Sequence, residues 1–401
     1  MAGHRIISGP GLRLVPPQPI KTSTAADHRP IVLHALGGPD DVVLMASLVA
    51  ALERGGQFRQ VVVHACAADT AVTADDLLPD PGMPAPDSWL SVEGDDRTEQ
   101  LAAMLAGFEA ALLDEEPDLV VVAGAGDAAL ACALAAAKQG VALAHVESGL
   151  RQTGGAPSLM ALNRVLTDRL ADTLLAFSAH DANQLLDEGI PDSRVHAVGH
   201  TGIDMLRRHQ AAALARQAWS SYGLPVHGYV LVDLGGGEPE LDAEVLGAAV
   251  DAVARLHTHV PAIVRVRPGT DWAPAENSHL TTLAAAGVRC ATDLSYVDAL
   301  SLLTGAGAVV TDAGALQDEA SAVGVACHTL GEDTARAATL LHGTNVLIGA
   351  DPAAIAEVRP TGEPPVAAAI ELWDGRAGER AGETLVAHYV LHSDHGLGVR
   401  A

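Results

Sequence analysis

Residues 141–151, with the sequence Val-Ala-Leu-Ala-His-Val-Glu-Ser-Gly-Leu-Arg, decide the fold class of this chain. The first four of these residues are small and apolar, which is typical of a strand buried on both faces. The run ends in His145, Glu147 and Arg151, and parallel α/β sheets bind ligands at the carboxyl ends of their strands. Glu147 and Arg151 therefore have two interpretations. They form a structural ion pair that closes the turn, or they act on an anionic sugar substrate.

Strand-like and helix-like segments alternate on both sides of this stretch. One series of short apolar strands runs from Ile31 to Val198, and a second series starts near Tyr229. This alternation predicts mostly parallel sheets with helices on both faces, an α/β fold. Because 401 residues are too many for one core, we expect two Rossmann-like domains with the ligand site in the cleft between them. The expected segments are a loose N-terminal arm over 1–28, an N-terminal domain over 29–204, a connection over 205–226 and a C-terminal domain over 227–372.

The composition excludes several classes of protein. A formal net charge of −26 repels a polyanion, so we expect no nucleic-acid partner. No run of about 18 apolar residues occurs, so we expect no membrane span. The four cysteines lie far apart, and neither they nor the histidines have the spacing of a metal site. These features favour a cytoplasmic protein with reduced thiols and without a metal.

Several collinear segments resemble the signatures of one family. Residues 145–151 resemble the H-V-E-A-G-L-R motif of the non-hydrolysing UDP-N-acetylglucosamine 2-epimerases, and residues 311–320 resemble their T-D-S-G-G-x-Q-E-E-A motif. The other matching segments include Asn163-Arg164, residues 198–204 and residues 343–349. The resemblance implies the glycosyltransferase B architecture, in which a C-terminal helix, here over residues 373–401, crosses back to the first domain.

By this resemblance, a nucleotide sugar such as UDP-N-acetylglucosamine binds mainly to the C-terminal domain. Asp312 to Ala315 lie between a strand and a helix, where the small residues Ala313 and Gly314 let a diphosphate approach backbone N–H groups. Glu319 lies one turn into that helix and is expected to bind the ribose hydroxyls. The alternative interpretations are that Glu319 is a solvated helix residue and that Gly314 is an ordinary turn glycine. The other expected nucleotide-sugar-binding residues are Gly37, Gly235, Arg265, Arg267 and Arg336.

Three of these residues have a second interpretation. Gly235 opens a run of three glycines, which either cradles a phosphate with bare N–H groups or forms a turn with positive φ. Arg265 and Arg267 follow a buried strand. They either contact phosphate or uridine, or they are the charged tip of a strand without a ligand.

The sequence departs from the family pattern where the chemistry takes place. Removing the weakly acidic C2 proton of the sugar needs a positioned base, and reprotonation from the opposite face needs an acid. Ala125 replaces the carboxylate of the family's H-G-D-T loop, and residues 157–162 lack the carboxylates of its P-E-E segment. Asp127, two residues after Ala125, substitutes only if this loop is rebuilt. The family's G-T-R-P-E loop becomes residues 37–41, without its arginine.

These observations leave three hypotheses for the function. The length of the resemblance favours an epimerase-like or eliminating enzyme in which Glu147, Arg151 and Asp127 are catalytic and no cofactor is needed. The missing carboxylates favour a glycosyltransferase that uses a small-molecule acceptor, or a catalytically silent homologue that binds a partner. We expect a homodimer, because the family tends to dimerise through its N-terminal domain.

Overall fold

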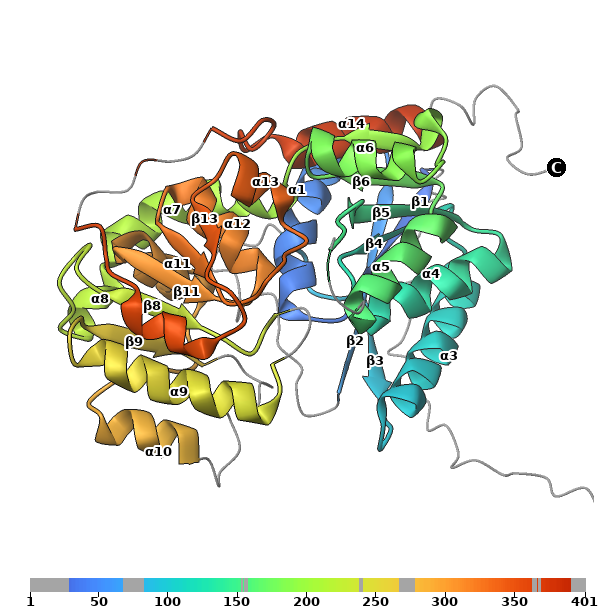
Figure 1. Ribbon diagram of the computed structural model, residues 1–401. Helices are drawn as coiled ribbons and strands as arrows, with labels where there is room; N and C mark the ends of the chain where they lie inside the picture. The colour runs from blue at the N-terminus through green and yellow to red at the C-terminus, as the bar shows by residue number, and fades with distance from the viewer. Residues whose placement is uncertain are drawn as a thin grey trace, which may run out of the picture.

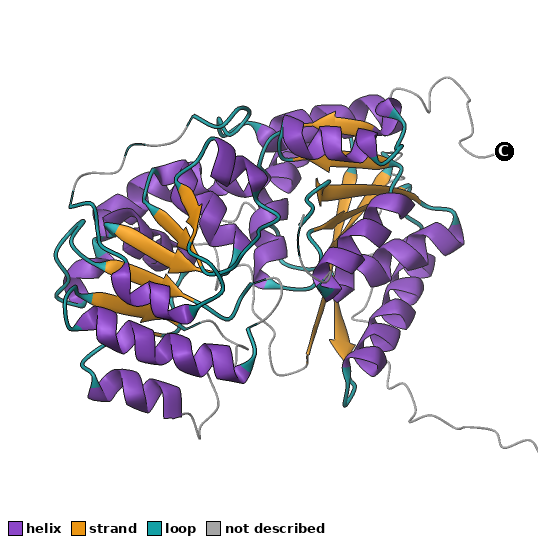
Figure 2. Cartoon of the chain, in the orientation of Figure 1, coloured by secondary structure: helices purple, strands orange, loops and turns teal. Residues whose placement is uncertain are grey.

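The chain forms two α/β domains that lie side by side (Figure 1). The computed structural model describes residues 29–67, 83–152, 154, 158–237, 241–266, 278–362, 366 and 369–390. The expected N-terminal arm and Arg267 lie outside these residues. In each domain helices cover the sheet (Figure 2), and every strand pairing is parallel. This arrangement confirms the predicted pair of Rossmann-like domains.

The N-terminal domain is built on a seven-stranded sheet in the order β3-β2-β1-β4-β5-β6-β7. Its strands are β1 (Ile31–Leu36), β2 (Arg59–Ala67), β3 (Ser88–Val92), β4 (Leu119–Ala123), β5 (Ala142–Ser148), β6 (Thr173–Ala176) and β7 (Val195–Ala197). Its helices are α1 (Pro39–Gly55), α3 (Arg97–Glu115), α4 (Asp127–Gln139), α5 (Leu159–Leu170) and α6 (Ala179–Asp187), with a 3₁₀ turn over Asp192–Arg194. The order places the ends of β1, β4 and β5 next to one another, so their following loops share one edge.

The C-terminal domain has a six-stranded sheet in the order β10-β9-β8-β11-β12-β13. Its strands are β8 (Val230–Asp233), β9 (Ala262–Arg265), β10 (Arg289–Ala291), β11 (Ala308–Thr311), β12 (Cys327–Thr329) and β13 (Asn345–Leu347). Its helices are α9 (Ala243–His257), α10 (Ser278–Ala285), α11 (Tyr296–Gly305), α12 (Gly314–Val323) and α13 (Ala337–Leu341), with a 3₁₀ helix over Pro352–Glu357. The pairing of β8 with β11 brings the loop after residue 233 against Asp312.

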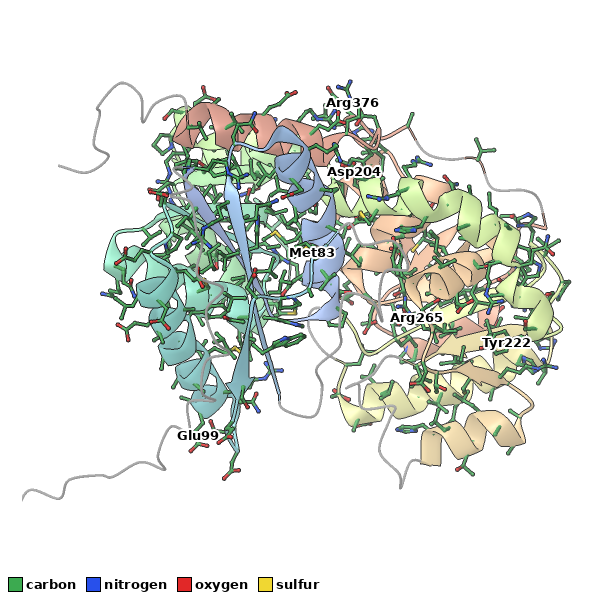
Figure 3. All side chains as sticks on the ribbon, turned by 180° about the vertical axis from the view of Figure 1, so that it is seen from behind. Met83, Glu99, Asp204, Tyr222, Arg265 and Arg376 are labelled. Carbon is green, nitrogen blue, oxygen red and sulfur yellow. The ribbon has the colours of Figure 1, made fainter. Side chains whose placement is uncertain are left out.

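Two segments connect the domains. The first is α7 (Thr201–Arg216), which packs against both α1 and α11. The short α8 (Ala218–Ser221) follows it. The second leads into α14 (Ala377–Tyr389), which lies on α1 of the N-terminal domain (Figure 1). Asp204, labelled in Figure 3, caps α14 by accepting hydrogen bonds from the backbone N–H groups of Ala377 (3.1 Å) and Gly378 (2.7 Å). A carboxylate at a helix N-terminus is favourable because of the helix dipole.

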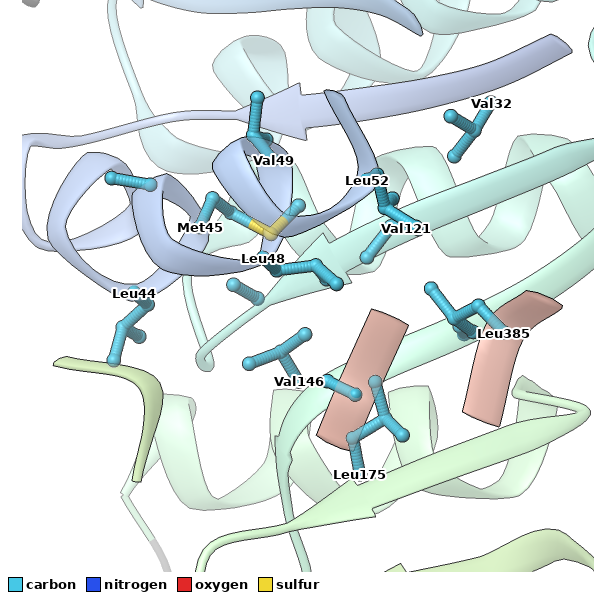
Figure 4. Close-up of a cluster of buried hydrophobic side chains, with 14 of the residues drawn as sticks. Val32, Leu44, Met45, Leu48, Val49, Leu52, Val121, Val146, Leu175 and Leu385 are labelled. Carbon is cyan, nitrogen blue, oxygen red and sulfur yellow. The ribbon is translucent and has the colours of Figure 1, made fainter. Parts of the chain in front are cut away.

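The core of the N-terminal domain needs α14 to be complete. Leu48 and Leu52 of α1 lie in one buried cluster with Leu385 of α14 (Figure 4). Gly378 allows this approach, because a Cβ there would lie 2.5 Å from the backbone carbon of Ser47. Among the described residues, no helix has both the length and the apolar character that crossing a bilayer requires.

Candidate functional site

A pocket of about 440 Å³ lies between the two domains. The N-terminal domain contributes the loops that follow β1 and β4 and the end of β5. The C-terminal domain contributes Arg265 (labelled in Figure 3), Tyr296, the start of α12 and Arg336. These are mostly carboxyl ends of parallel strands, where α/β proteins bind small molecules. The structure therefore places the cleft where the sequence predicted it.

Glu147 lies at the end of β5 with its carboxylate in this pocket. Its backbone has φ = 72°, and the strand register shifts between Val146 and Ser148. Positive φ is strained for a residue with a side chain, and such residues cluster at functional sites. The side chain is held by two cations, with Arg336 Nη2 at 2.7 Å from Oε1 and Arg164 Nη2 at 3.5 Å from Oε2. Burial raises the pKa of Glu147, but Arg336 and Arg164 outweigh it and hold the pKa at about 2.

A second carboxylate, Asp41, faces Glu147 from the first turn of α1. Its Oδ2 accepts hydrogen bonds from the backbone N–H groups of Gly37 (2.8 Å) and Gly38 (3.1 Å). A Cβ built on Gly124 would lie 3.4 Å from Asp41 Oδ1 and 3.5 Å from Glu147 Oε2. Burial raises the pKa of Asp41 to about 7, which the negative charges of Asp40 and Glu147 reinforce and the two backbone N–H groups oppose.

Arg151 does not line the pocket. It forms ion pairs with Asp168 (2.7 Å) and Glu188 (2.8 Å). Asp168 is fully buried and also accepts from His145 Nδ1 at 2.7 Å. The other ring nitrogen of His145 lies 2.8 Å from the backbone oxygen of Gly124, which can only accept. The motif arginine thus belongs to a structural network beneath the Gly124 loop, as the ion-pair interpretation allowed, but its partner is not Glu147.

Asp127 lines the pocket at the start of α4. Its Oδ1 accepts a hydrogen bond from Asn163 Nδ2 (2.8 Å), and the same amide group donates to the backbone oxygen of Ala125 (3.1 Å). The loop after β4 is therefore tied to α5 through Asn163. Asp127 reaches the pocket although it lies two residues beyond the position of the missing family carboxylate.

The start of α12 brings backbone N–H groups to the pocket. Ala313, Gly314 and Ala315 line it, and no side chain caps the first turn. Unpartnered N–H groups of this kind bind anions. Gly314 is needed here, because a Cβ would lie 2.5 Å from Arg336 Nε. Arg336 also bonds to Asp318 Oδ2 (3.0 Å), so one guanidinium joins α12 to Glu147 across the cleft.

The glycine run after β8 forms a turn. Gly235 has φ = 84°, and the N–H groups of Gly235 and Gly236 donate to the Asp312 carboxylate at 3.0 and 3.3 Å. The Asp312 carboxylate therefore occupies the two N–H groups that a phosphate would use. Gly236 lines the pocket, but Gly235 and Asp312 do not. This geometry supports the turn interpretation over the phosphate cradle.

The other expected binding residues surround the pocket. Gly37 and Glu319 line it, and Glu319 Oε1 accepts a hydrogen bond from the Tyr296 hydroxyl (3.0 Å). Arg265 lines it too and forms an ion pair with Asp233 (3.3 Å). The sequence analysis did not assign roles to Asp41, Arg164, His200 or Asp318. All four lie in segments that the sequence analysis compared with the family motifs, namely residues 37–41, Asn163-Arg164, residues 198–204 and residues 311–320. His200 donates from Nε2 to Asp318 at 3.1 Å, because its Nδ1 accepts from the N–H of Gly202.

Comparisons with known proteins agree on one family. A family model described as UDP-N-acetylglucosamine 2-epimerase matches residues 50–385. The chain is 31% identical over 280 residues to a UDP-N-acetylglucosamine 2-epimerase of Methanococcus maripaludis, covering 67% of this chain and 74% of that protein. It is 28% identical over 322 residues to a UDP-2,3-diacetamido-2,3-dideoxy-D-glucuronate 2-epimerase of Pseudomonas aeruginosa, covering 80% of this chain and 88% of that protein. The Methanocaldococcus jannaschii UDP-GlcNAc 2-epimerase, solved with UDP-GlcNAc and UDP, superposes with a TM-score of 0.76 at 25% identity, covering 89% of this chain and 99% of that one.

Proposed function

Because the chain belongs to the UDP-N-acetylglucosamine 2-epimerase family, we propose that it inverts C2 of a UDP-N-acetylglucosamine-like nucleotide sugar. The observation that carries this proposal is the bridge made by Arg336. Its guanidinium lies against Gly314 at the start of α12 and contacts Glu147 at 2.7 Å. A diphosphate bound at the N-terminus of α12 therefore leaves the adjoining sugar next to the carboxylates of the N-terminal domain.

The reaction that fits this arrangement is an elimination followed by re-addition. A base takes the proton from C2, the electron pair of the C2–H bond forms a C1=C2 double bond, and the C1–O bond breaks with its pair leaving on UDP. UDP then adds back to C1 while C2 receives a proton on the opposite face. The positive end of α12 and Arg336 favour the negative charge that develops on the departing diphosphate.

We predict that incubation with UDP-GlcNAc in deuterium oxide places deuterium at C2 and forms the C2 epimer. NMR of the sugar follows both changes, and thermal stabilisation by UDP reports binding separately. A ligand at 100 times its Kd raises the free energy of unfolding by about 2.7 kcal/mol. UDP binding without exchange at C2 contradicts the epimerase. UDP release that depends on an added acceptor would instead indicate a glycosyltransferase. Binding of UDP without any turnover of the nucleotide sugar would indicate a silent homologue.

We also infer a homodimer. Leu159, Leu162 and Leu166 lie on one face of α5 and are 56%, 48% and 42% exposed. The free thiols of Cys132, Cys290 and Cys327 fit a reducing compartment, in support of the cytoplasm.

An apolar stripe such as the one formed by these leucines favours burial against another molecule. We expect a dimer mass in sedimentation equilibrium and a shift toward monomer on Leu162→Glu. A wild type that is monomeric at micromolar concentration contradicts the dimer.

A further inference from the structure

We propose that Asp41 is the residue that exchanges a proton with C2 on one face of the sugar, while Glu147 stays an ionised, fixed carboxylate. This inference rests on the proposed function and assigns a proton carrier within the same site. It starts from the position of Asp41 in the pocket, where Asp41 and Glu147 flank Gly124.

The two oxygens of Asp41 have different surroundings. Oδ2 is fixed by the N–H groups of Gly37 and Gly38, which also complete the N-terminal cap of α1. Oδ1 lies on the side of Gly124 and Glu147, 3.4 Å from the point where a Cβ of Gly124 would lie. Gly124 has φ = 71° and no side chain, so the space between the carboxylates is left open. One oxygen therefore orients the group and the other is available to a bound sugar.

The charges around the two carboxylates separate their proton affinities. Glu147 is paired with Arg336 and Arg164, which keep its pKa at about 2, so it stays ionised at neutral pH. Among the described residues no cation forms an ion pair with Asp41; burial, reinforced by the negative charges of Asp40 and Glu147, raises its pKa to about 7. Asp127 on α4 and Arg265, which is paired with Asp233, line the same pocket. Two carboxyl groups with separated pKa values are typical of acid–base sites, and the one near 7 carries the proton.

The step assigned to Asp41 is a single proton transfer. Ionised Asp41 takes the C2 proton on Oδ1 as the C2–H pair becomes the C1=C2 double bond and UDP leaves with the C1–O pair. In the return direction protonated Asp41 gives the proton back to C2 from the same face. The charge of Glu147 opposite it raises the proton affinity of Asp41 and makes it a better base.

The test compares Asp41→Asn with Asp187→Asn. The asparagine carbonyl can still accept the N–H groups of Gly37 and Gly38, so α1 keeps its cap, while the proton carrier is lost. Asp187 is exposed at the end of α6, outside the pocket, and its substitution removes the same charge. We expect Asp41→Asn to slow deuterium exchange at C2 about 100-fold and Asp187→Asn to leave it unchanged. Both variants should keep the thermal shift with UDP. Asp41→Glu, which retains an acid, should keep measurable exchange and serves as a second variant.

The pH profile gives an independent readout. The kcat/KM for exchange should rise with pH through about 7 in the wild type, because the ionised base is the active form of the free enzyme. In Asp41→Asn this rise should disappear. Exchange in Asp41→Asn within threefold of the wild type overturns the assignment of Asp41 and leaves the proposed function standing. A wild type that binds UDP without exchange overturns both.

Discussion

Replacing Arg336 with methionine is expected to lower the free energy of unfolding by about 3 kcal/mol. The guanidinium joins Glu147 of one domain to Asp318 of the other, at 2.7 and 3.0 Å, and all three side chains are at least nine-tenths buried. Removing one member of a buried ion pair leaves charges without compensation, which costs more than losing an exposed pair. The loss is moderated because Glu147 keeps Arg164 and Asp318 keeps His200. Equilibrium urea unfolding followed by circular dichroism measures it.

Arg376→Met is the matched control for this prediction. Arg376 is exposed and pairs with Glu379 at 2.9 Å, so its replacement should change the free energy of unfolding little.

The double variant Arg336→Met with Glu147→Gln should recover part of the stability that Arg336→Met loses, since it removes one of the charges left without a partner. Because the pKa of Glu147 is lowered to about 2, its contribution is present above pH 4.5 and is lost as the pH falls toward 2. Equal stability of Arg336→Met and Arg376→Met would contradict the bridge.

Asp168→Asn is expected to destabilise the N-terminal domain by about 3 kcal/mol. Asp168 is fully buried and accepts from His145 (2.7 Å), Arg151 (2.7 Å) and the N–H of Gly149 (3.2 Å). An asparagine has one acceptor oxygen in place of the two carboxylate oxygens, so it cannot accept from all three groups. The substitution keeps the shape of the side chain, removes its negative charge and turns one acceptor into a donor.

The pH dependence of this loss has a definite sign. Burial raises the pKa of Asp168, but His145 and Arg151 outweigh burial and lower it below its usual value. A carboxylate with a lowered pKa stabilises the fold above its usual range and loses this effect as the pH falls. The difference between wild type and Asp168→Asn should therefore shrink below about pH 4. Asp187→Asn, on the exposed side of α6, is the control and should change urea unfolding little. A constant difference from pH 7 to pH 3 would be inconsistent with an ionised Asp168.

Local sequence patterns were enough to predict the fold and the position of the cleft. The apolar strands were visible because parallel strands covered on both faces need continuous runs of Val, Leu and Ala, as in β4 and β5. The same logic placed Glu147 and the start of α12 at strand ends. These predictions depend on neighbours in the sequence, so one chain is enough to make them.

The partners of the charged residues could not be predicted in the same way. Arg151 lies four residues after Glu147, yet the positive φ values of Glu147 and Gly149 turn the chain so that Arg151 faces Asp168. The partners of Glu147 are instead Arg164 of α5 and Arg336, which comes from the other domain. Asp312 meets Gly235 because β8 and β11 are adjacent in the sheet. Strand order and domain closure decide these contacts, and neither leaves a local signal.

The return of α14 to the first domain has a consequence for biosynthesis. Leu385 fills the cluster around Leu48 and Leu52, so these side chains are covered only by a segment that the ribosome makes after the strands of the C-terminal domain. The nascent N-terminal half therefore emerges with an uncovered apolar surface, and the C-terminal half is made before that surface closes. Folding of the two halves is coupled through α14, and a chain that stops before α14 exposes that surface to aggregation.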